Sequence, residues 1–153
     1  MSDFNPESFL AGEYKEAFST QDPEIPAGEY TGIIEKITPR QITPKDGGEA
    51  RLLVMIDWQV DDENVRKICG RDKVIAQQKL WLDTEPNGTL STGKGRNAHL
   101  GRLREAVGQN KPGKPWSWSM LLGQVATIKV TSEAGTDEYE GRYFYRVTGV
   151  TKK

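Results

Sequence analysis

The segment Lys73–Leu82, KVIAQQKLWL, followed along the chain by Arg96–Val107, RNAHLGRLREAV, decides the fold of this protein. The first run is rich in β-branched and aromatic residues and is bounded by polar residues, which predicts a strand. The second run carries Leu100 and Leu103 at helical spacing, and Gly108 follows where a left-handed residue commonly ends a helix. One strand followed by one helix is therefore expected here.

Four further runs have the same strand character, and all other helical signals are weaker. These runs are Gly28–Thr38, Arg51–Val60, Gln124–Thr131 and Arg142–Val150. Five strands with one helix between the third and the fourth predict a mainly β, mostly antiparallel five-stranded barrel of the oligonucleotide/oligosaccharide-binding kind. The usual cargo of such barrels is single-stranded nucleic acid.

Length and composition fit one soluble domain without a cofactor. The 153 residues hold one cysteine, Cys69, and one histidine, His99, so an internal disulfide and a structural zinc site are not expected. No apolar run approaches the roughly 20 residues that span a bilayer. The acidic start also lacks the pattern of a secretion signal, so a cytoplasmic protein is expected, in the host cell if a phage encodes it.

Charge divides the chain into two parts. Residues 1–29 hold seven acidic residues against one lysine, a net charge of −6, whereas residues 30–153 hold twenty Lys and Arg against fifteen Asp and Glu, a net charge of +5. We therefore expect an acidic extension over residues 1–25, with a short helix at Pro6–Ala17 and a linker, before a barrel domain over residues 26–153. The extension also carries apolar anchors such as Phe4 and Phe9. It is either a disordered end or a segment that docks on its own domain, on a second copy or on a replication or recombination protein.

The alternation of side chains predicts which face of each strand is buried. In the second strand the apolar set is Leu52, Val54, Ile56, Trp58 and Val60, which is the expected core face. In the third strand, Gln77, Lys79 and Trp81 share the face opposite to the apolar set, and a base can stack on Trp81 while Lys79 reaches a phosphate. The alternative is that Trp81 packs under the helix. The orientation of the strand decides between the two.

Cations and aromatic rings near the third and the last strand complete the expected binding site. On the last strand Tyr143 and Tyr145 resemble a stacking platform more than Phe144 does, whereas the acidic loop Glu133–Glu140 would repel phosphates. The expected nucleic-acid-binding residues are Arg51, Arg71, Lys73, Gln77, Lys79, Trp81, Lys94, Arg96, Tyr143 and Tyr145.

One stretch imitates a nucleotide-binding loop. Residues 88–97, GTLSTGKGRN, nearly match the phosphate-binding pattern G-x-x-x-x-G-K-[ST], but Gly95 stands where a hydroxyl must bind Mg²⁺. The alternation of strands and helices that accompanies such a loop is also missing. Binding without catalysis is the favoured interpretation, and a nucleotide hydrolase is a minor alternative.

Several segments resemble a family of bacteriophage replication and recombination proteins. They are Phe4–Leu10, Ile25–Tyr30, Asp57-Trp58, Lys79–Leu82, Gly101–Gly108 and Leu122–Val125. Members of that family are single-stranded DNA-binding proteins with an oligonucleotide-binding barrel. The resemblance implies a protein that coats single-stranded DNA with little base preference during phage replication or recombination. The alternative is a non-catalytic protein–protein adaptor or a structural phage component built on the same barrel. The sequence does not determine whether DNA or RNA is preferred, nor the oligomeric state.

Overall fold

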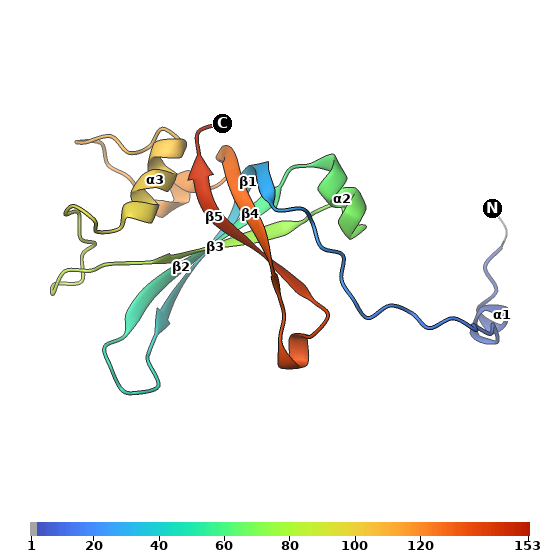
Figure 1. Ribbon diagram of the computed structural model, residues 1–153. Helices are drawn as coiled ribbons and strands as arrows, with labels where there is room; N and C mark the ends of the chain where they lie inside the picture. Colours follow the sequence, from blue (N-terminus) through green and yellow to red (C-terminus); the bar gives the residue numbers. More distant parts are fainter. Residues whose placement is uncertain (1–2) are drawn as a thin grey trace.

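Five strands close into one barrel, in the order β1-β2-β3-β5-β4 (Figure 1). The computed structural model describes residues 3–153. Its elements are α1 (Pro6–Leu10), β1 (Gly28–Ile42), β2 (Arg51–Val60), α2 (Glu63–Cys69), β3 (Ile75–Trp81), α3 (Ala98–Ala106), η1 (Trp118–Leu121), β4 (Val125–Ala134), η2 (Asp137–Tyr139) and β5 (Tyr143–Thr151). Every neighbouring pair is antiparallel except β3 and β5, which are parallel. The predicted mainly β barrel with a helix between the third and fourth strands is confirmed.

The core is built from the inward faces of the strands. The predicted inner set of β2 is buried from Val54 to Val60, whereas Leu52 near the end of the hairpin is 38% exposed. Trp58 lies at the centre, fully buried, and its indole N–H donates a hydrogen bond to Oε1 of buried Gln78 at 2.9 Å. Because a buried N–H without a partner is costly, this pair lets a large ring fill the barrel without leaving an unsatisfied donor. Helix α3 packs against β5 and contributes buried Leu100 and Leu103 to the same core.

Gly32 of β1 lies directly against two core side chains, Trp58 and Ile128. A Cβ built on Gly32 would lie 2.7 Å from Cδ1 of Ile128 and 2.8 Å from Cε3 of Trp58. We expect Gly32→Ala to lower the free energy of unfolding by about 1–3 kcal/mol, because one extra methyl group overpacks the barrel. Gly28→Ala is the matched control, since a Cβ there meets no atom within 4 Å. Urea unfolding of both variants checks the prediction, and equal stabilities would contradict it.

Three local features differ from the sequence-based expectation. Strand β1 continues to Ile42, and the extension's helix α1 ends at Leu10 instead of Ala17. Strands β2 and β3 are joined by α2, which was not predicted. The sequence carries the residues that favour both ends of this helix, Asp62 and Gly70. Oδ1 of Asp62 accepts a hydrogen bond from the N–H of Val65 at 2.9 Å, and Gly70 ends the helix with a φ of 63°. Within residues 3–153, no helix combines the length and the apolar character needed to span a membrane.

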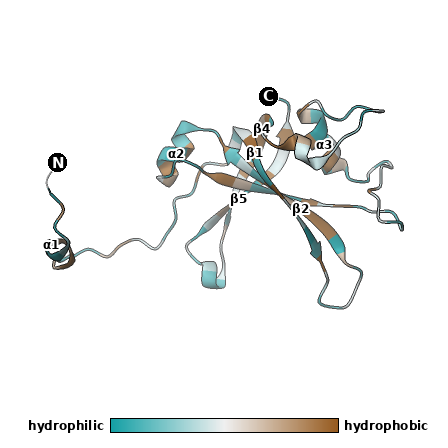
Figure 2. Cartoon of the chain, turned by 180° about the vertical axis from the view of Figure 1, so that it is seen from behind, coloured by the Kyte–Doolittle hydropathy of each residue, from teal (hydrophilic) through white to brown (hydrophobic). Residues whose placement is uncertain are grey.

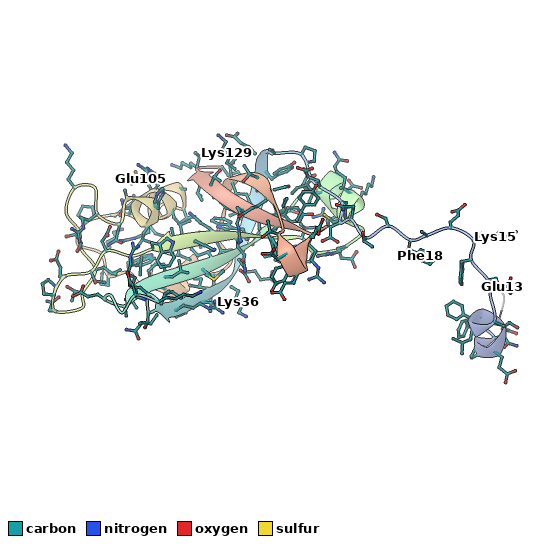
Figure 3. The ribbon with its side chains drawn as sticks, turned by 60° about the horizontal axis from the view of Figure 1, so that its bottom comes forward. Glu13, Lys15, Phe18, Lys36, Glu105 and Lys129 are labelled. Atoms are coloured by element: carbon teal, nitrogen blue, oxygen red, sulfur yellow. The ribbon has the colours of Figure 1, made fainter. Side chains whose placement is uncertain are left out.

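Within residues 3–25, the contacts that fasten the acidic extension to the barrel lie at its C-terminal end. The N–H of Asp22 donates to the carbonyl of Gly141 at 2.7 Å, Tyr145 donates to the carbonyl of Pro23 at 2.9 Å, and Ile25 is buried in the core. The preceding residues run away from the barrel, and Figure 3 shows Glu13, Lys15 and Phe18 along this stretch. Residues 22–25 thus form a strap beside β5, with a free segment in front of it.

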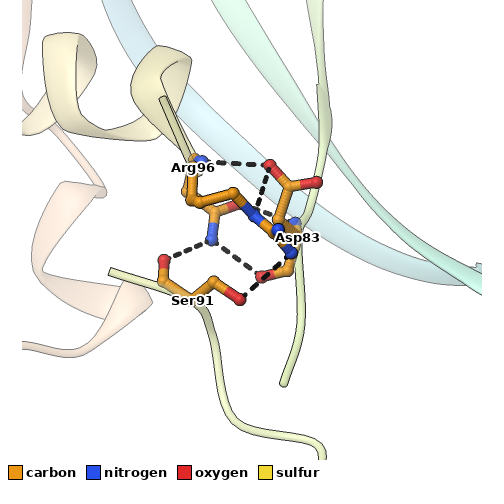
Figure 4. Close-up of polar contacts among 4 residues, drawn as sticks. Asp83, Ser91 and Arg96 are labelled. Carbon is orange, nitrogen blue, oxygen red and sulfur yellow. Dashed lines mark hydrogen bonds and ion pairs between the residues drawn. The ribbon is translucent and has the colours of Figure 1, made fainter. Parts of the chain in front are cut away.

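The connection between β3 and α3 is held by a clasp of hydrogen bonds (Figure 4). The side chain of Asn97 accepts from the N–H of Asp83 at 2.7 Å and donates to the carbonyls of Asp83 and Ser91 at 2.8 and 2.9 Å. The N–H of Asn97 donates to Oδ2 of Asp83 at 3.1 Å. The stretch that imitates a nucleotide-binding loop therefore ends in a structural clasp that fixes α3 next to the end of β3.

Candidate nucleic-acid interface

The predicted binding face of β3 points away from the core. Ala76, Gln78 and Leu80 are buried, whereas Lys79 and Trp81 are exposed, with 44% of the Trp81 surface accessible. The two-residue period of a strand explains the division, because each apolar side chain that enters the barrel sends its neighbours outward. The alternative in which Trp81 packs under the helix is wrong.

Strand pairing extends this outer face onto β2 and β1. Trp81 is paired with Leu53, and Lys79 is paired with Met55. Leu53 is paired with Trp81 on one side and with Arg40 of β1 on the other. It is only 5% exposed although it lies on the outer face. Arg51 places its guanidinium carbon 4.9 Å from the centre of the Trp81 ring, a cation–π contact. An exposed ring with a cation above it therefore forms one end of the face.

A cavity of about 620 Å³ lies at the other end, between the starts of β3 and β5. Four cationic side chains line it: Arg71, Lys73, Arg142 and Arg146. Phe144 and Tyr143 supply aromatic surface, and Asp22 of the strap supplies the one carboxylate of the lining. Glu35 pairs with Lys73 and Glu133 pairs with Arg146, so Arg71 and Arg142 are the cations that favour an anionic ligand at this end.

A chain of polar contacts connects this cavity to the middle of the face. Arg146 donates through Nη1 to Oε1 of Gln77 at 3.3 Å, and Gln77 donates through Nε2 to Oδ1 of Asp57 at 3.1 Å. Nε of Arg146 also lies 3.0 Å from Oε2 of Glu133. The guanidinium is therefore held in one orientation and partly neutralised, while Phe144 lies beneath it, with 5.7 Å between the guanidinium carbon and the ring centre.

The last strand exposes the face opposite to the one that the sequence favoured. Val147 is buried, so the alternation turns Tyr145 inward and leaves Phe144 and Arg146 outward. The hydroxyl of Tyr145 donates a hydrogen bond to the carbonyl of Pro23, and it lies 3.5 Å from Sγ of Cys69. Burial first, and then the hydrogen bond with Cys69, raise the pKa of Tyr145 above its ordinary value. Tyr143 and Tyr145 therefore line the wall of the cavity and do not form an open stacking platform.

The remaining expected residues separate into free and engaged cations. Within residues 3–153, Arg51, Arg71, Lys79 and Lys94 make no ion pair within 4.0 Å. Lys73 pairs with Glu35 of the β1 bulge. Arg96 is engaged in the clasp, 3.8 Å from Oδ2 of Asp83. Lys94 lies in the loop before α3 and does not line the cavity.

The sequence-based set missed Arg142, Phe144, Arg146 and Asp22. Arg146 and Phe144 belong to the aromatic and basic run Arg142–Arg146, so the signal was present and only the face was misjudged. Asp22 gave no signal, because its place in the cavity results from the strap. Within residues 3–153, no group of three or more His, Cys, Asp or Glu side chains is arranged to hold a metal ion. Neither a protein-family model nor a curated protein sequence matches this chain.

Proposed function

We propose that this protein binds single-stranded DNA without catalysis and with little base preference, and that it coats DNA during phage replication or recombination. The observation that supports the proposal is the outer face of β3, which carries an exposed tryptophan at one end and meets a cation-lined cavity at the other. The seven residues of β3 span roughly 20 Å. A strand of several nucleotides fits along that length.

The side-chain types on this face match the two demands of sequence-independent binding. Trp81 and Phe144 offer rings on which any base can stack, because every base has a flat π face. Lys79, Arg71 and Arg142 offer charge to the sugar–phosphate backbone, which is the same for every sequence. Single strands are favoured over duplex because stacking on a side chain needs bases whose faces are not already stacked on each other.

Intrinsic fluorescence provides the direct test of this proposal. Trp58 is buried, Trp116 and Trp118 are half-buried and packed against the core, and Trp81 is the exposed tryptophan. A single-stranded oligonucleotide is therefore expected to quench the Trp81 component, and Trp81→Phe should remove most of that quenching while leaving binding measurable. Absence of quenching and of binding would favour the alternative, a protein–protein adaptor or structural component on the same barrel.

Affinity is expected to fall as salt rises. If roughly three to five cations of the face meet phosphates, the logarithm of the association constant should fall against the logarithm of salt concentration with a slope of about −2 to −4, since each contact on a single strand contributes about −0.7. Titrations of mixed-sequence single-stranded and double-stranded oligonucleotides at several salt concentrations check this. A salt-independent affinity, or tighter binding of the duplex, would contradict the proposal.

A further inference from the structure

The free segment in front of the strap, residues 3–19, carries large apolar side chains that are mostly exposed to solvent. We call it the arm. Its five large apolar residues are between 59% and 81% exposed: Phe4, Phe9, Leu10, Tyr14 and Phe18. Two ring pairs form within the arm, with ring centres 5.5 Å apart for Phe4 and Phe9 and 5.8 Å apart for Tyr14 and Phe18. Part of α1 is coloured hydrophobic in Figure 2 although it lies away from the barrel. Exposed side chains of this kind, collected in one short segment, mark an interaction site.

The barrel carries an apolar groove that is also uncovered. Its volume is about 460 Å³, within the roughly 300–1,000 Å³ of pockets that bury small ligands. Its lining is Glu35, Lys36, Ile37, Pro39, Val54, Trp118, Ser119 and Leu122. Leu122 is 49% exposed, and its neighbours Met120 and Val125 are 45% and 40% exposed. Ile37 and Val54 belong to the inward faces of their strands, so the groove opens on the opposite side of the β1–β2 hairpin from Trp81.

Phe9 and Leu10 of the arm cannot reach the groove of their own barrel. Asp22 is fastened to Gly141 beside β5, whereas β1 and β2, which form the groove, lie across the barrel from β5. The chain from Asp22 to Phe9 covers at most about 45 Å when fully extended. A domain of this size has a radius of roughly 18 Å, so half of its circumference is on the order of 55 Å. Phe9 and Leu10 therefore need a groove on another molecule.

The charge distribution favours a second copy of this chain as the molecule whose groove binds the arm. The arm, residues 3–19, holds four acidic residues against one lysine, a net charge of −3, whereas residues 20–153 carry a net charge of +2. An acidic arm is therefore attracted to the body of another copy, whereas two bodies repel each other. The apolar anchors then supply the short-range contact that the charge alone does not.

We propose that the arm of one copy docks in the apolar groove of a second copy, with Phe9 and Leu10 as anchors. The contact is head-to-tail, because arm and groove are different surfaces of the same chain, so each added copy presents a new free arm or groove. The outer face of β3 stays open in such an assembly. The association does not depend on DNA, so it can be tested separately from the proposed binding function.

Two variants remove one half of the contact each, on exposed residues that the fold does not need. Phe9→Ser with Leu10→Ser removes the anchors of the arm, and Leu122→Asp places a negative charge in the groove. Each change should weaken self-association at least about ten-fold, measured by sedimentation velocity over a range of concentrations without DNA. Ile68→Asp is the matched control, because Ile68 is 41% exposed on α2, outside the groove, and should leave self-association unchanged.

Mixing the two variants gives the decisive result. At concentrations where each variant alone is monomeric, an equimolar mixture should form a heterodimer that grows no further, because the arm variant retains a groove and the groove variant retains an arm. A mixture that stays monomeric would overturn the proposal, as would a full-length chain that is monomeric at every concentration. Self-association that survives Leu122→Asp would place the arm on another surface and would also overturn it.

Discussion

Trp81→Ala is expected to weaken binding of a single-stranded oligonucleotide by about 1–3 kcal/mol, or roughly 5- to 150-fold, while leaving the fold intact. The ring is 44% exposed on the outer face of β3, so its removal opens no cavity in the core. It also removes the surface on which Arg51 rests, at 4.9 Å from the ring centre. Both the stacking surface and the orientation of one cation are therefore lost in a single change.

Two companion variants separate stacking from charge. Lys79→Ala should weaken binding less and flatten the salt slope by about 0.7, the contribution of one phosphate contact on a single strand. Trp81→Phe should recover part of the affinity because a smaller ring remains. Fluorescence anisotropy gives the affinities, and thermal unfolding gives the stability of each variant. If Trp81→Ala mainly lowers the melting temperature and leaves the affinity of the folded molecule unchanged, the ring has a structural role only.

Trp58→Ala is expected to have the largest effect on stability, about 3–5 kcal/mol. Trp58 is fully buried at the centre of the barrel, and its loss leaves a cavity that the closed sheet cannot fill by collapsing. Because domains of this kind are stable by only about 5–15 kcal/mol, the variant should be largely unfolded in mild urea. Urea unfolding followed by far-ultraviolet circular dichroism measures the change.

The hydrogen bond between Trp58 and Gln78 can be isolated by a double-mutant cycle. Gln78→Leu alone should lower the free energy of unfolding by about 1–3 kcal/mol, because it leaves the buried indole N–H without an acceptor. Combined with Trp58→Phe, which has no N–H, the same change should cost clearly less. Equal costs of Gln78→Leu in both backgrounds would show that the hydrogen bond contributes nothing to stability.

The local pattern of the sequence predicted the five strands and α3, and the buried faces of β2 and β3. The inner set of β2 from Val54 to Val60 and the outer set of β3 follow from a two-residue period in which one set is wholly apolar or nearly so. Gly108 adopts a φ of 72° just after α3, as expected of the residue that ends a helix. The two caps of α2 are equally present in the sequence, but the helix has only one buried residue, Val65, so no apolar periodicity marks it as a helix.

The tertiary structure alone decided the face of β5 and the composition of the cavity. Along Arg142–Arg146 both alternating sets contain large aromatic residues, so periodicity does not tell which set enters the core. Packing decides it: Val147 completes the barrel, and the strap binds the hydroxyl of Tyr145. The cavity depends on the parallel pairing of β3 with β5, which brings Arg71 and Lys73 beside Arg142 and Arg146 across about 70 residues of chain. Closure of a barrel is a non-local event, because it joins strands whose sequences carry no mutual signal. For that reason the sequence predicted the exposed tryptophan and the barrel, whereas the cation-lined cavity beside it emerged only from the closed sheet.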